Sequence, residues 1–193
     1  MNDVSTLPDS ELMQRYARGD RASFQVLLER HQGKIYNFCM RFVGHSSLAT
    51  ELTQETFLRL VKARHQFRGE SRFTTWLYSI ARNLCIDELR RRKNRPEQEL
   101  KEETLTESTY AFPPADQGIK TDHKRFAIEL ARALNQLPVE QREVFILRHL
   151  SGFRFTEIAD MTHQPLGTVK SRMRYALERL QAELETFREL VGQ

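Results

Sequence analysis

Apolar residues recur at intervals of three and four along almost the whole chain, and this spacing most constrains how the chain can fold. Such spacing gathers apolar side chains on one face of an α-helix, whereas a strand requires alternation at every second residue. One stripe begins after Asp20, a good helix cap, and ends before Gly44, a good helix terminator. Its members are Phe24, Leu27, Leu28, His31, Ile35, Phe38, Cys39 and Phe42. We find no comparable strand pattern, so the sequence predicts an all-α fold.

The same spacing predicts further helices in the first half of the chain. A short helix near the N-terminus includes residues 12–16, and another helix follows Gly44 and ends before a break at Phe67–Arg72. Thr74 or Thr75 is expected to cap the helix after the break, because threonine is a good N-cap residue. That helix ends in four consecutive basic residues, Arg90–Lys93.

Residues 96–121 depart from the helical pattern and divide the chain into two parts. Prolines and acids replace the apolar period, and residues 96–122 carry seven acids against two lysines, a net charge of −5. This composition predicts a flexible acidic linker that spans roughly 30 Å as a coil. The linker would join two small helical domains, residues 9–95 and 122–187.

Helical spacing resumes after the linker and ends in a helix-turn-helix pattern. One helix runs to about Leu137, and Pro138 suits the first turn of the next helix, which ends at Gly152. A short helix at about 155–161 and a turn then lead to a last helix that starts with Pro165.

Basic and polar residues gather early in this last helix: Lys170, Ser171, Arg172, Arg174 and Tyr175. The first residues of such a helix read base edges in the major groove, where Lys and Arg pair with guanine. Its N-terminal amides, with Thr168, suit a phosphate. An opposite face is spaced to pack inward: Val169, Met173, Ala176 and Leu180. The pattern favours DNA binding, and the alternative is an ordinary surface helix with solvated charges.

Trp76 and Asn83 lie seven residues apart, two helical turns, and so share one face of the helix after the break. A tryptophan near a basic stretch can stack on an unpaired base. A lone helical tryptophan equally suits a core, and an asparagine suits a solvated face. Arg90–Lys93 is suited to phosphates, or to a solvated helix end that is favourable at the C-terminal dipole.

Other features exclude several classes of protein. The net charge of +4 and the pI of about 9.2 are only mildly basic, so charge alone does not establish a nucleic-acid partner. No apolar run of about 18 residues predicts a membrane span, and residues 1–8 lack the features of a secretory signal. The sequence has no catalytic motif and its six histidines are scattered, so we expect no enzyme activity, no metal and no cofactor. Cys39 and Cys85 are expected to be buried free thiols in a reducing cytoplasm.

Two sets of motifs resemble extracytoplasmic-function (ECF) sigma factors. Residues 51–57 (ELTQETF), 67–73 (FRGESRF), 75–83 (TWLYSIARN) and 87–91 (DELRR) resemble region 2 of that family. Residues 137–138 (LP), 142–145 (REVF), 157–159 (EIA) and 165–172 (PLGTVKSR) resemble its region 4. The resemblance implies a subunit that directs RNA polymerase to promoters.

The resemblance also implies a role for each matched position. Glu51, Gln54 and Glu55 would dock on the clamp helices of the largest subunit of core RNA polymerase, with the flap region as a further contact. The residues implied to read the −10 element as a melted strand with a flipped base are Phe67, Arg68, Ser71, Phe73, Trp76 and Asn83, with Arg90 and Arg91 on phosphates. Those implied to read the −35 element are Lys170, Ser171, Arg174 and Tyr175, with Thr168 and Arg172 nearer the backbone.

Further partners implied by the resemblance are promoter DNA and an anti-sigma factor, which we expect to engage both domains. The chain would act in the cytoplasm, at the nucleoid, or be held at the inner membrane face by a membrane-bound anti-sigma factor, without inserting itself.

Three places depart from the family pattern. Thr50 stands where an additional acid is common, and Arg154 replaces the usual Ser or Thr cap, although Thr156 is placed to cap the same helix. The turn at residues 162–164 has His163 where glycine is common, and histidine tolerates a positive φ better than most residues do.

Two alternatives to a sigma factor stay open. One is a polymerase-independent regulator that binds duplex operators through the helix-turn-helix, which leaves residues 51–57 and 67–73 unexplained. The other is a helical adaptor that binds proteins and has basic surfaces only for solubility.

Overall fold

The computed structural model describes residues 4–67, 69, 72–93 and 121–191, with the backbone alone at 121–125 and 186–191. Every regular element in these ranges is helical, which confirms the all-α prediction. In chain order they are η1 (Val4–Thr6), α1 (Asp9–Ala17), α2 (Arg21–Val43), α3 (Ser46–Lys62), η2 (Arg64–Gln66), α4 (Phe73–Lys93), α6 (Thr121–Gln136), α7 (Val139–Phe145), the π-helical turn η3 (Ile146–Leu150), α8 (Phe155–Thr162) and α9 (Leu166–Val191). The expected linker at 96–121 lies outside the described residues except for Thr121.

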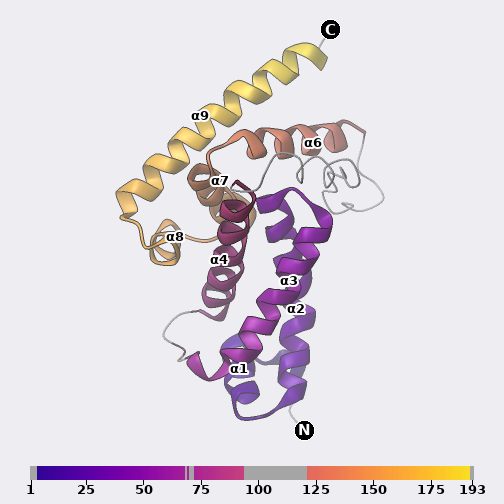
Figure 1. The fold of residues 1–193 in the computed structure, drawn as a ribbon, viewed down its shortest axis with the longest axis vertical. Helices are drawn as coiled ribbons and strands as arrows, with labels where there is room; N and C mark the ends of the chain where they lie inside the picture. The colour runs from indigo at the N-terminus through magenta and orange to yellow at the C-terminus, as the bar shows by residue number, and fades with distance from the viewer. Residues whose placement is uncertain (1–3, 68, 70–71, 94–120, 192–193) are drawn as a thin grey trace.

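The first domain is a bundle of α2, α3 and α4, with α1 packed at the end where α4 begins (Figure 1). The Asp20 carboxylate caps α2, because its Oδ1 accepts the backbone N–H groups of Ala22 (3.0 Å) and Ser23 (3.4 Å). Gly44 ends the helix with a φ of 71°. Both ends of α2 are therefore as the sequence predicts, and its apolar stripe faces the core.

Both cysteines are buried and free, as expected, and they lie in contact across α2 and α4. A hydrogen bond with Cys39, together with burial, raises the pKa of the Cys85 thiol well above its ordinary value. A thiol held in its protonated form reacts slowly, so Cys85 serves packing.

The start of α4 differs from the prediction. Neither Thr74 nor Thr75 caps the helix, because α4 already begins at Phe73 and the Trp76 N–H bonds to the Arg72 carbonyl (3.2 Å). The Phe73 side chain is 2% exposed and packs on the His31 ring of α2. Burial of this aromatic ring fixes the first turn, which local propensity alone does not predict.

In the second domain, α6 and α7 lie beneath the long helix α9, and α8 precedes it (Figure 1). The expected helix from Pro138 to Gly152 is continuous but changes from α to π geometry at Ile146. Its ends are shifted slightly, because Pro138 occupies the cap position and not the first turn. Pro165 likewise precedes α9, which begins at Leu166, and its carbonyl accepts the Val169 N–H (3.1 Å).

The helix-turn-helix has the expected proportions with two unusual residues. Arg154 precedes α8, and the Glu157 carboxylate accepts its backbone N–H (2.8 Å), so the alternative cap at Thr156 is wrong. His163 ends α8 with a φ of 52°, the left-handed conformation that the sequence indicated it would have to tolerate.

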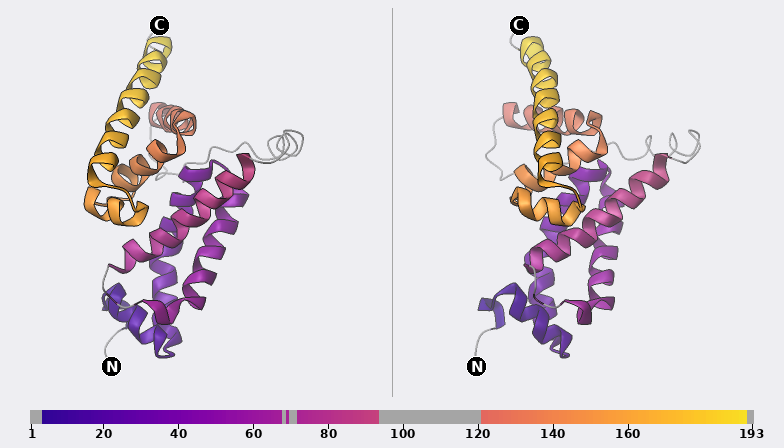
Figure 2. Two further views of the ribbon diagram at one scale, coloured as in Figure 1. Left: turned by 60° about the vertical axis from the view of Figure 1, so that its left-hand side comes forward. Right: turned by 90° about the vertical axis from the view of Figure 1, so that its left-hand side faces the viewer.

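The two domains contact each other directly. The buried Arg142 of α7 donates to the Phe42 carbonyl at the end of α2 (3.0 Å) and to acceptors in its own domain. The rings of Tyr78 in α4 and Phe153 before α8 meet edge to face, with centroids 4.9 Å apart. Figure 2 shows α8 and the beginning of α9 facing the first domain from one side.

Candidate nucleic-acid interface

The first turns of α9 expose a basic and aromatic surface. Val169, Met173, Ala176 and Leu180 are buried, as the spacing predicts, which turns Lys170, Arg174 and Tyr175 outward. The Arg174 guanidinium lies 4.7 Å from the centroid of the Tyr175 ring, and Tyr175 is 47% exposed. This stacking holds a cation and a phenol together on the surface that a major groove would meet.

The remaining residues expected to read the −35 element are partly buried. Ser171 is half-buried and its hydroxyl donates to the Thr168 carbonyl (2.9 Å), while Thr168 is itself half-buried. Arg172 is half-buried and faces the first domain. In this structure Lys170, Arg174 and Tyr175 are thus the members of the set that are openly accessible.

Aromatic rings cluster beside the break between η2 and α4. Phe67 lies with its ring centroid 5.4 Å from that of Trp76 and 6.0 Å from that of Phe73, and Phe73 lies 6.3 Å from Trp76. Phe73 is buried, whereas Phe67 and Trp76 are half-buried. Trp76 therefore packs on the core with one part of its ring and leaves another part accessible, so its burial is compatible with both of the roles that the sequence left open.

A groove next to this cluster joins residues of two helices. It has a volume of about 340 Å³, and its lining residues are Arg59, Lys62, Ala63, Gln66, Trp76, Ile80 and Asn83. Trp76 and Asn83 share it, as their spacing predicts. Arg59 and Lys62 were missed by sequence reasoning, because they come from α3 and reach the groove only through the packing of α3 on α4. Basic residues beside an aromatic floor suit a strand with an unstacked base.

The basic residues expected to contact phosphates lie further along α4, in its last turn. Arg90 and Arg91 are exposed, and Arg91 pairs with Glu88 (2.7 Å). The predicted contacts Arg68 and Ser71 lie outside the described residues.

A second exposed surface follows α3. Glu51 and Gln54 are exposed and Glu55 is partly so, as docking on a partner requires. Leu58, which sequence reasoning missed, lies one turn beyond Glu55 and is 53% exposed. Its position seven residues after Glu51 places it on the same face, and this spacing was the available signal. The α3 face therefore has an apolar centre beside two carboxylates.

A cleft of about 470 Å³ separates α4 from the helix-turn-helix. Its lining includes basic residues of both domains, Arg82, Arg90 and Lys93 from the first and Arg172 from the second, together with the acids Glu140 and Glu143 of α7. At one edge Arg82 pairs with the buried Glu143 of α7 and also donates to the Asn83 amide oxygen (2.9 Å). The candidate −10 and −35 surfaces thus border the same cleft.

No cluster of potential metal ligands occurs in the part of the chain that the structure describes. Its described helices are also all too short or too polar to cross a bilayer.

The fold and these surfaces define a two-domain helical protein with a helix-turn-helix. Residues 27–95 match Sigma-70 region 2, and residues 127–180 match Sigma-70 region 4. The chain is 32% identical over 185 residues to the RNA polymerase sigma-H factor of Pseudomonas aeruginosa, covering 92% of this chain and 94% of that protein. It is 32% identical over 174 residues to the ECF RNA polymerase sigma factor SigW of Bacillus subtilis, covering 86% and 91% of the two chains.

Solved structures agree with these matches. The sigma factor RpoE of Bartonella quintana, in complex with the anti-sigma factor NepR, superposes with a TM-score of 0.67 at 27% identity, covering 84% of this chain and 96% of RpoE. CnrH, in complex with the cytosolic domain of CnrY, has the same fold with a TM-score of 0.67 at 22% identity, covering 92% of this chain and 97% of CnrH. The chain belongs to the ECF sigma factors of the sigma-70 family, the transcription initiation factors that direct RNA polymerase to promoters.

Proposed function

We propose that this sigma factor binds core RNA polymerase through the α3 face, captures the −10 element as a melted strand in the groove of Trp76 and Asn83, and reads the −35 element with α9. The observation that carries the proposal is that groove, which combines an accessible aromatic edge, an amide and the cations Arg59 and Lys62. A regulator that binds only duplex operators has no use for such a feature. The chain itself would perform no catalysis, and it would act in the cytoplasm.

The α3 face supports polymerase docking. An exposed leucine beside carboxylates is the pattern of an amphipathic helix that lies in a partner groove. Leu58 would supply the buried apolar contact and Glu51, Gln54 and Glu55 the polar rim.

The purified chain should bind core RNA polymerase and start transcription on genomic DNA at sites that sequencing of transcript ends can map. Leu58→Asp should weaken binding to core polymerase by at least about tenfold, because it places a charge at the centre of the interface. Gln32→Asp on the exposed part of α2 is the matched control, with an effect of no more than about twofold. Tight binding to duplex DNA without any binding to core polymerase would instead identify an operator-binding regulator.

We further infer regulation by an anti-sigma factor that contacts both domains. The similarity to RpoE, which was solved with NepR, supports this inference. The resemblance to the family separately suggests an inhibitor that is bound to the inner membrane. Cross-linking of the co-purified partner should give links to both α3 and α9, and links confined to one domain would contradict it.

A further inference from the structure

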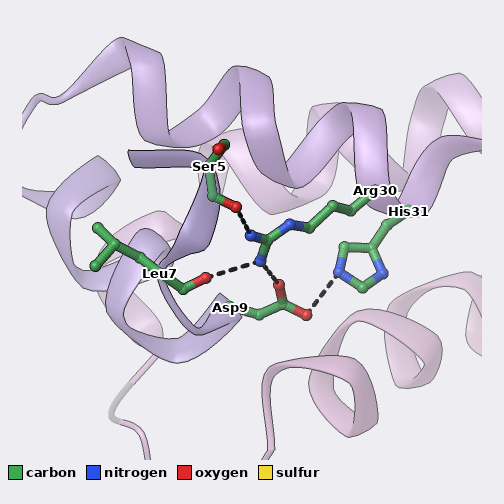
Figure 3. Close-up of polar contacts among 5 residues, drawn as sticks. All are labelled: Ser5, Leu7, Asp9, Arg30 and His31. Atoms are coloured by element: carbon green, nitrogen blue, oxygen red, sulfur yellow. Dashed lines mark hydrogen bonds and ion pairs between the residues drawn. The ribbon is translucent and has the colours of Figure 1, made fainter. Parts of the chain in front are cut away.

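The N-terminal segment is held on α2 by the Asp9 carboxylate and by two backbone carbonyls (Figure 3). Asp9, at the start of α1, accepts a hydrogen bond from Arg30 Nη1 through Oδ1 (2.7 Å), and its Oδ2 lies 2.8 Å from His31 Nε2. Arg30 also donates to the carbonyls of Leu7 (2.9 Å) and Ser5. Asp9 thus fixes two neighbouring side chains of α2, and Arg30 fixes the backbone that precedes α1.

The same contacts lead to the cluster at the −10 groove. The His31 ring, held by Asp9, packs on Phe73 with centroids 5.4 Å apart. Phe73 in turn contacts Phe67 and Trp76, the two accessible rings of the cluster. A buried ring whose position is fixed on one side transmits that position to the rings packed on the other side, because protein interiors are close-packed.

Helix α1 also contacts the elements that carry the aromatic cluster. It packs against both η2 and α4, the elements on the two sides of the break at 67–72. Leu12 and Met13 are fully buried, and Gly69, with a φ of 76°, lies near the Gln14 side chain. Displacement of α1 would therefore move both η2 and α4, and Phe67 lies between these two elements in the chain.

We propose that Asp9 is a positioning residue for capture of the −10 strand, which it serves by holding His31, and through it Phe73, behind the Phe67–Trp76 pair. This inference rests on the proposed function of the groove. Asp9 lies on the far side of the aromatic cluster and acts on DNA only through the rings. Its removal should weaken the capture of one base and leave the other promoter contacts intact.

The test uses holoenzyme and fork-junction DNA that carries a mapped −10 element as a single strand. Scanning an abasic site through that strand with the unmodified chain identifies the position whose base contributes most to binding. Asp9→Ala should then reduce affinity about tenfold on the intact fork, the scale of a lost hydrogen bond to a charged group. On the fork that lacks the captured base, it should change affinity by no more than about twofold.

Glu11→Ala is the matched control. Glu11 is a carboxylate in the same helix turn, but it pairs with Arg15 within α1 (2.9 Å) and not with α2. It should leave binding to both forks unchanged. Asp9→Asn, which keeps an acceptor for His31, should give a smaller loss and provides a better-folded variant. Circular dichroism and affinity for core polymerase report the folding of every variant.

Three outcomes would overturn the inference. Equal loss on both forks would make Asp9 a general scaffold residue, and no loss on the intact fork would show that Asp9 does not act on capture. If no abasic position affects the unmodified holoenzyme, strand capture by the groove fails, and the proposed function fails in that part as well. Only the last outcome concerns the unmodified chain, so the two failures are distinguishable.

Discussion

At the scale of single residues, His31 couples protonation to stability. Its ring is 2% exposed, and burial lowers the pKa of His31 more than the neighbouring Asp9 raises it, while Lys34 and Arg30 lower it further. The unfolded chain therefore takes up this proton at a higher pH than the folded chain does. It follows that the free energy of unfolding falls as the pH drops below the ordinary value of 6.5.

Replacing His31 should change this dependence. His31→Gln should lower stability at neutral pH, because a buried ring that packs on Phe73 is lost, and should flatten the decline as the pH drops from neutral to below 6.5. Urea denaturation across that range measures both effects. His65→Gln, at an exposed position, should retain the slope of the unmodified chain, and an unchanged slope in His31→Gln would contradict the assignment.

Asp20 also couples protonation to stability, here through a carboxyl group whose pKa is lowered in the folded chain. Hydrogen bonds, first from the Ser23 hydroxyl (2.7 Å) and then from backbone N–H groups, lower the pKa of Asp20 below 3.8. A lowered carboxyl pKa contributes stability above that pH, and the contribution is lost as the pH falls through the folded-state pKa. Asp20→Ala should thus lower the thermal midpoint at pH 7, and the difference from the unmodified chain should narrow below pH 3.8, as calorimetry can check.

At the scale of elements, α9 should show which charges meet DNA. Lys170→Ala combined with Arg174→Ala should weaken binding to a −35 duplex and reduce the slope of log affinity against log salt by about two, because each of the two cations displaces about one counterion from the DNA. Arg179→Ala removes the same kind of charge nine residues after Lys170, half a turn around the helix, and should leave the slope nearly unchanged. Fluorescence anisotropy over a series of salt concentrations measures both.

The elements also show what the sequence could predict. Periodicity with local caps correctly predicted α2 between Asp20 and Gly44 and the inward face of α9, because both depend on residues close in the chain. The start of α4 was predicted wrongly, since it depends on the burial of Phe73 against α2.

The residues of the candidate site likewise divide into those that a local pattern predicts and those that depend on tertiary packing. The shared face of Trp76 and Asn83 follows from helical spacing within α4. The contribution of Arg59 and Lys62 to their groove depends on how α3 packs on α4, which no local pattern contains. The contact of Asp9 in α1 with His31 in α2 likewise depends on tertiary packing, so no local sequence pattern predicts it.

At the scale of the whole molecule, the arrangement of the domains conflicts with simultaneous use of both DNA surfaces. Promoter elements at −10 and −35 lie about 85 Å apart along duplex DNA, at about 3.4 Å for each base pair. Arg90 of the first domain and Arg172 of the second line a single cleft. On the proposed roles of these residues, the domains would have to move apart before one chain contacts both elements.

The ion pair of Arg82 with the buried Glu143 should hold the closed arrangement. Glu143→Gln removes its charge, so the variant should populate more extended forms and show a larger radius of gyration by small-angle X-ray scattering. Glu140→Gln, at an exposed position beside the same cleft, is the control and should leave the radius unchanged. A Glu143→Gln variant as compact as the unmodified chain would show that other contacts suffice.

The contact between Arg82 and Glu143 also has a consequence for competition among sigma factors. A ligand that binds only the open form has an apparent dissociation constant equal to the intrinsic one divided by the open fraction. If core polymerase engages both domains and so binds only the open form, the Arg82–Glu143 pair would set how well this chain competes for a limited supply of polymerase, with the proposed α3 docking face unchanged. Weakening Glu143 should let this sigma factor displace others at lower concentration, even though no residue of the α3 face has been altered.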